Sequence, residues 1–120
     1  MEALIKTEME MGNMEQIMTE SDWKLFRSRI SDWQERFMGK LVCEYTDILT
    51  DASKLSSDKF WELEKRIKGD KKLKGVICEM RRSTMLYNLM DLYREGAIDD
   101  SDLEGFNDEL VRHVKNAAKW

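Results

Sequence analysis

The sequence predicts an all-α protein, because turn-forming residues are scarce and apolar residues recur at helical spacing. The 120 residues contain no proline and only six glycines, so the frequent tight turns of sandwiches and barrels are missing. A chain of this length makes one hydrophobic core. We therefore expect a single compact, four-helix-bundle-like domain over residues 21–120.

The first twenty residues are predicted to be an acidic, methionine-rich extension ahead of this domain. They carry five glutamates against one lysine, five of the nine methionines and no aromatic residue. Chain ends with few large side chains are often held loosely. We expect residues 1–20 to be frayed or to form a loosely docked helix.

A long first helix is predicted over residues 22–49. Its start is indicated by a cluster of cap-forming residues, Thr19, Ser21 and Asp22. Apolar residues then follow in steps of three and four, which places them on one helical face: Trp23, Phe26, Ile30, Trp33, Phe37, Leu41, Tyr45 and Ile48. At 1.5 Å per residue this helix is roughly 42 Å long, and we expect it to be the spine of the fold.

A short second helix and a longer third helix are expected next. Ser56 or Ser57 caps the second helix, which continues to Lys68 and stops at Gly69. Apolar residues then fill most positions over residues 76–95 and leave only a narrow polar face. We therefore place the third helix there, at the centre of the fold.

The fourth helix has the clearest predicted start in the chain. Gly96 ends the third helix, Asp99 is the N-cap of the fourth, and Asp100 and Asp102 follow in a first turn where the helix dipole favours anions. The segment that starts at Asp100 also resembles the first half of a calcium-binding loop. Its twelfth position, however, is Val111 instead of the required glutamate. We interpret this segment as a helix start and expect the helix to continue to the C-terminus.

Several functional classes are disfavoured by composition and by missing motifs. No stretch is long and apolar enough to span a membrane, and Cys43 and Cys78 belong to no metal-binding pattern, so we expect free thiols in a reducing cytoplasm. His113 is the only histidine, and its neighbours on the predicted helix supply no nucleophile. We expect no enzymatic activity, no catalytic or metal-binding residue and no cofactor.

Charge is distributed unevenly along the chain, although the net charge is only −4. Residues 50–75 hold eight basic and five acidic residues, and residues 97–120 hold three basic and six acidic residues. One candidate binding site is a basic patch that comprises Lys65, Arg66, Lys68, Lys71, Lys72, Lys74, Arg81 and Arg82. The other is an acidic face that comprises Asp99, Asp100, Asp102, Glu104, Asp108 and Glu109.

Aromatic residues at helical spacing usually belong to the core. Four large apolar residues nevertheless fall outside the main stripes, namely Leu25, Val42, Trp61 and Trp120. If some of them are exposed, they are typical components of a protein-binding face.

Four segments carry a family resemblance: residues 21–30, 33–37, 60–67 and 102–110, which read SDWKLFRSRI, WQERF, FWELEKRI and DLEGFNDEL. They resemble a group of small all-helical proteins without an assigned function, carried by plasmids and integrated mobile elements of gut Firmicutes and often labelled multidrug transporter or complexin. The resemblance covers residues 21–115. It implies a bacterial cytoplasmic protein and supports treating residues 1–20 as an extension, and it supplies no binding residue.

Two functions remain open at this level. The leading hypothesis is a non-enzymatic interaction factor of a mobile element, an inhibitor or adaptor that blocks a host defence or nucleic-acid-handling protein. Its acidic leader and acidic fourth helix would face a basic partner surface. The alternative is an accessory protein that binds nucleic acid through the basic patch. Homodimerisation is compatible with either function.

Overall fold

The described chain is entirely helical. The structure, a computed structural model, describes residues 17–117, and no strand occurs in this range. Its elements are α2 (Glu20–Thr50), α3 (Ser56–Asp70), η1 (Arg82–Thr84), α4 (Met85–Glu95), η2 (Asp100–Leu103) and α5 (Asp108–Ala117), where η denotes a 3₁₀ helix. The all-α prediction is confirmed.

α2 begins at a reciprocal capping box. Thr19 Oγ1 accepts a hydrogen bond from the backbone N–H of Asp22 (3.1 Å), and Asp22 Oδ2 accepts one from the backbone N–H of Thr19 (2.9 Å). The helix buries its apolar stripe continuously from Trp23 to Leu41. Trp33 packs this stripe against the C-terminal part of the core, because its ring centroid lies 6.3 Å from that of Phe106.

The core lies between α2, α4, η2 and α5. Its buried members are Ile17, Trp23, Phe26, Ile30, Trp33, Phe37, Leu41, Met85, Leu86, Leu89, Leu92, Ala97, Ile98, Leu103, Phe106, Leu110 and Val114. α3 contributes none of them, and none of its residues is buried.

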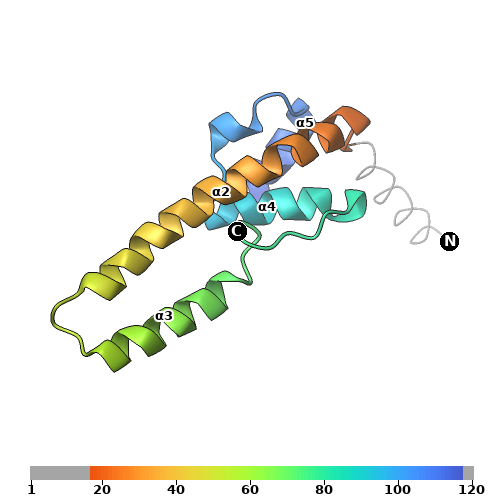
Figure 1. Cartoon of the computed structure of the whole chain (residues 1–120). Coiled ribbons are helices and arrows are strands. Elements are labelled where there is room, and N and C mark those ends of the chain that lie inside the picture. Colours follow the sequence, from red (N-terminus) through yellow and green to blue (C-terminus); the bar gives the residue numbers. More distant parts are fainter. Residues whose placement is uncertain (1–16, 118–120) are drawn as a thin grey trace.

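α3 turns back beside the C-terminal part of α2, whereas α4 and α5 lie against the N-terminal part (Figure 1). The C-terminal part of α2, the loop and α3 therefore form a two-helix projection, residues 38–70, which we call the hairpin. The expected compact packing applies to the core end of the molecule. The hairpin, whose two arms are the C-terminal part of α2 and α3, extends away from that end (Figure 1).

The predicted limits of α3 were wrong at both ends. Its N-cap is Leu55, and neither Ser56 nor Ser57 caps it from outside the helix. Gly69 lies inside the helix, which ends one residue later at Asp70. Gly69 does not adopt the left-handed conformation that makes glycine a helix stop.

The predicted third helix was too long. Residues 76–81 are not helical, and α4 starts only at Met85 after the short η1. Contacts from distant residues hold this segment open: the Glu95 carboxylate accepts hydrogen bonds from the backbone N–H groups of Lys74 (2.9 Å) and Gly75 (3.2 Å). Asn88 Nδ2 likewise donates to the carbonyl of Glu79 (2.9 Å). The Glu95 bonds fix the turn before residues 76–81, and the Asn88 bond occupies a carbonyl that a helix would pair with a backbone N–H.

The predicted fourth helix is divided in two. Asp99 is an N-cap, as expected, and forms a capping box with Asp102, but the helix that it caps is η2, which ends at Leu103. Gly105 then takes a positive φ of 95°, and α5 begins at Asp108. Asn107 caps this second start, because its Oδ1 accepts from the backbone N–H of Leu110 (2.9 Å).

The proposed N-terminal extension lies almost wholly outside the described residues. Its last part is described, and there Ile17 is buried in the core. Asn107 Nδ2 donates a hydrogen bond to the carbonyl of Ile17 (2.5 Å). The part of residues 1–20 that is described is therefore attached to the start of α5.

Candidate interaction surfaces

The eight residues of the predicted basic patch do not form one surface. Arg82 lies at the start of α2, where it pairs with Glu20 (2.7 Å) and its guanidinium sits over the Trp23 ring at 5.9 Å. Arg81 pairs with Glu79 (2.7 Å). These two arginines are on the core end of the molecule and are already engaged with local acids.

Arg66 is also engaged, but within the hairpin. It pairs with Glu44 (3.2 Å) and Asp70 (3.7 Å), and its guanidinium lies 5.7 Å from the centre of the Tyr45 ring. The Tyr45 hydroxyl donates to Asp70 Oδ2 (2.5 Å), and burial together with this bond raises the pKa of Tyr45 to about 12. This group ties α3 to α2 and leaves Arg66 little freedom to bind a ligand.

The lysines of the predicted patch are different. Lys65, Lys68, Lys71 and Lys72 are exposed, and Lys74 is half-buried. Within residues 17–117, none of these five forms an ion pair. The free positive charge of the patch is therefore carried by lysines of α3 and the turn after it.

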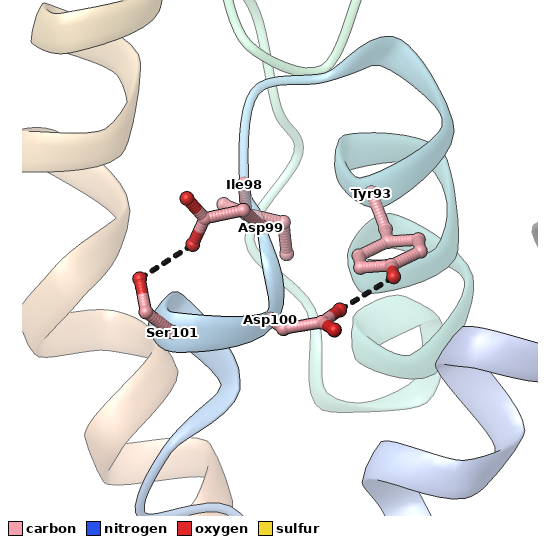
Figure 2. A pocket seen from close by; sticks show the side chains of 5 residues that line it. All are labelled: Tyr93, Ile98, Asp99, Asp100 and Ser101. Carbon is pink, nitrogen blue, oxygen red and sulfur yellow. Dashed lines mark hydrogen bonds between the residues drawn. The ribbon is translucent and has the colours of Figure 1, made fainter.

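Half of the predicted acidic face is used to build η2 (Figure 2). Asp99 accepts from Ser101 Oγ (2.6 Å) and from the backbone N–H of Asp102 (3.2 Å), and these bonds lower the pKa of Asp99. Asp102 forms an ion pair with Arg36 (2.6 Å). Asp100 accepts from the Tyr93 hydroxyl (2.6 Å). The open hollow of about 480 Å³ beside these residues is lined by acids that already have partners.

The other half of the acidic face is free. Glu104, Asp108 and Glu109 are exposed and form no ion pair within the described residues. Glu104 and Asp108 line a second shallow hollow of about 500 Å³, together with Lys115. Lys115 also lies 3.7 Å from Asp100 and so reduces the negative field of this face.

Among residues 17–117, the most exposed aromatic side chains lie on the hairpin. Phe60 is 63% exposed and Trp61 is 65% exposed, and their rings pack edge to face with centroids 5.0 Å apart. Val42 of α2 is also exposed on the hairpin, where it lines a hollow together with Ile67. Of the apolar residues outside the main stripes, Leu25 packs against the core. Trp120 lies outside the described residues.

The other candidate groups serve structure or stand alone. His113 Nδ1 lies 2.8 Å from the carbonyl of Glu109, one turn earlier in α5. Cys43 is exposed, and burial raises the pKa of the half-buried Cys78 thiol. Over residues 17–117, no group of three histidine, cysteine or acidic side chains is arranged to hold a metal ion.

The described residues define the class of the molecule as all-α, with a helical core and a projecting hairpin. Comparisons with protein-family models, curated proteins and solved structures find no match to this chain. Among the described helices, none combines the length and the apolar character needed to cross a bilayer.

Proposed function

We propose that the protein is a non-enzymatic interaction factor and that it binds its partner through the hairpin. One observation carries this proposal: α3 has no buried residue, and its two adjacent aromatic side chains are more than half exposed. Exposed aromatic residues typically supply the main binding energy of protein interfaces. A patch of this kind on a small protein marks a binding site more often than a defect of folding.

The hairpin replaces the acidic face as the favoured binding surface. Asp99, Asp100 and Asp102 each hold a structural partner, so their charge is partly neutralised before any ligand arrives. Phe60 and Trp61 make no comparable contribution to the core. The origin in a bacterial mobile element rests on the family resemblance, and the role as an inhibitor or adaptor, including one directed against a host defence, is argued by elimination.

The test compares proteins captured by the wild-type chain and by a Phe60→Ser/Trp61→Ser variant. Ile77→Ser is the matched control, because Ile77 is 62% exposed but lies outside the hairpin. A specific partner should be captured by the wild type and by the control and lost with the double variant. The captured protein is then titrated in pure form. Equal capture by all three proteins would place the binding surface elsewhere.

Nucleic-acid binding is a second candidate, favoured by the unpaired lysines of α3. Lys65 and Lys68 follow Trp61 at helical spacing within α3, so these three residues share one face of the helix, and Lys72 lies in the turn after it. Stacking on an aromatic ring beside backbone-binding lysines is the usual way to hold a single strand. Fluorescence anisotropy with labelled single-stranded and duplex DNA at two salt concentrations tests this. Replacing the three lysines by alanine should reduce the salt slope by about 2–3.

A further inference from the structure

The hairpin carries a continuous apolar groove. One hollow of about 480 Å³ is lined by the apolar residues Phe60, Leu63 and Ile67 of α3, together with the charged residues Glu64, Lys68 and Lys71. A second, of about 220 Å³, is lined mainly by apolar residues of α2, including Val42. Ile67 and Lys71 line both hollows, so the two adjoin along the line where α2 and α3 meet.

The exposed aromatic area at this groove is large for a small protein. A phenylalanine or tryptophan side chain presents about 150–250 Å², so Phe60 and Trp61 together leave roughly 250 Å² uncovered. A contact that used both rings on two molecules would take about 500 Å² from them, under half of the about 1,200 Å² at the lower end of specific interfaces. The groove, which Phe60 lines and Trp61 does not, has to supply the remainder, so we expect a weak contact.

Charge is opposite at the two ends of the groove. Residues 47–62, at the tip of the hairpin, hold four acids and two lysines, a net charge of −2. Residues 65–74, where the hairpin joins the core, hold six basic residues and one acid, a net charge of +5. A partner of one charge sign would be attracted at one end and repelled at the other. A surface with this pattern is complementary to itself when it is turned end for end.

We propose that the partner of the groove is a second copy of this chain, docked antiparallel through α3. Phe60 and Ile67 are seven residues apart, about 10 Å along the helix, so two α3 helices that cross near Leu63 place each Phe60 against the Ile67 end of the other copy. The acidic tip of each copy then lies beside the other copy's lysines. The inference rests on the proposed function, since it names the partner of the same surface.

The first test is the mass of the pure full-length chain by sedimentation equilibrium at about 1–100 μM, the range in which a micromolar dimer forms. Wild type should approach twice 14.3 kDa at the upper end. Phe60→Asp should weaken association at least tenfold, and Ile77→Asp, which adds the same charge at a residue that lines neither hollow, should not. Far-UV circular dichroism checks that each variant is folded.

The second test addresses the antiparallel direction. Asp58 and Lys68 lie five residues on either side of Leu63, so each faces the other residue of the second copy. Asp58→Lys and Lys68→Glu each place like charges together across the proposed interface, so each should weaken association, and the double variant should regain it. A monomeric wild type at the highest concentration would overturn the inference, and so would a dimer unaffected by Phe60→Asp. A monomer that still captures a protein through Phe60 and Trp61 would overturn self-docking and leave the proposed function standing. A dimer without other capture would support self-docking alone.

Discussion

Replacing Asp22 by asparagine should destabilise the protein by about 3 kcal/mol, because one buried carboxylate joins the starts of two helices. Asp22 is only 2% exposed. Its Oδ2 accepts from the Thr19 N–H (2.9 Å), the Thr19 hydroxyl (2.8 Å) and Asn107 Nδ2 (2.5 Å), and its Oδ1 accepts from the Asn107 N–H (3.0 Å). Asparagine has the same shape but offers one acceptor oxygen, and its NH₂ group opposes donors. Hydrogen bonds to a charged group contribute about 1.5–3 kcal/mol each and are not additive, which gives the estimate.

The same substitution should change how stability depends on pH. Burial raises the pKa of Asp22, but hydrogen bonds from Thr19 and Asn107 outweigh this effect, and the folded-state pKa is lowered. A carboxyl with a lowered pKa stabilises the fold above its unfolded pKa of about 3.9, and this contribution is lost as pH falls towards the folded pKa. The gap between wild type and Asp22→Asn should therefore narrow below about pH 4.

The assay is urea unfolding followed by far-UV circular dichroism at pH 7 and near pH 3. The control is Asp32→Asn, an exposed position on the same helix that takes part in no ion pair or hydrogen bond within the described residues, and it should change the free energy of unfolding by less than about 0.5 kcal/mol. A loss below about 1 kcal/mol for Asp22→Asn would show that the carboxylate is dispensable. An equal gap at both pH values would refute the role of its charge.

Four further substitutions probe local packing and backbone conformation, and all are measured by chemical or thermal unfolding. Gly75→Ala should cost about 1–3 kcal/mol, because a Cβ there would lie 2.2 Å from Cδ1 of the buried Phe37, whereas Gly69→Ala, with open space around it inside α3, should stabilise by about 0.5–1 kcal/mol. Gly96→Ala should cost about 1 kcal/mol, since this helix-ending residue has φ of 80°. Phe60→Ser should change the unfolding free energy by less than about 0.5 kcal/mol, and a larger loss would mean that the exposed ring supports the fold.

Much of the helical content could be predicted because its causes are local. The three-and-four spacing of apolar residues on α2 records a buried face directly. Gly96 ends α4 as expected, and the backbone N–H of Ala97 donates to the carbonyl of Leu92 (2.9 Å) in the usual glycine-ended motif. Each of these signals lies within a few residues of the feature that it predicts.

The errors share a non-local cause. Residues 76–81 have the composition of a buried helix, but Glu95, twenty residues away, takes the backbone N–H groups of the turn before them. The fourth helix is likewise divided where Arg29 of α2 donates to the carbonyls of Asp102 (3.1 Å) and Glu104 (2.5 Å). A helical pattern shows which conformation a segment favours locally. Hydrogen bonds from distant side chains stabilise a non-helical conformation instead, and the local pattern contains no sign of them.

The candidate surfaces were misjudged for the same reason. Counting charges along the chain joined Arg82 to the lysines of α3, because the sequence does not show that Glu20, 62 residues earlier, neutralises it. It also assigned Asp102 to a binding face, although Arg36, 66 residues earlier in the chain, forms an ion pair with it. The hairpin groove was missed because Val42 and Ile67 become neighbours only when α3 folds back on α2.

The distribution of satisfied and unsatisfied groups separates structural residues from candidate functional ones. At the core end, Arg82, Asp99 and Asp102 have identified partners, whereas Glu104, Asp108 and Glu109 form no ion pair within the described residues. On the hairpin and the turn after it, two aromatic rings and four lysines (Lys65, Lys68, Lys71 and Lys72) have no comparable contacts with the rest of the described chain. Exposing large aromatic side chains gains nothing for the stability of a monomer, since their burial is the main favourable term in folding. Their retention at a place that the core does not need is therefore best explained by a partner that covers them.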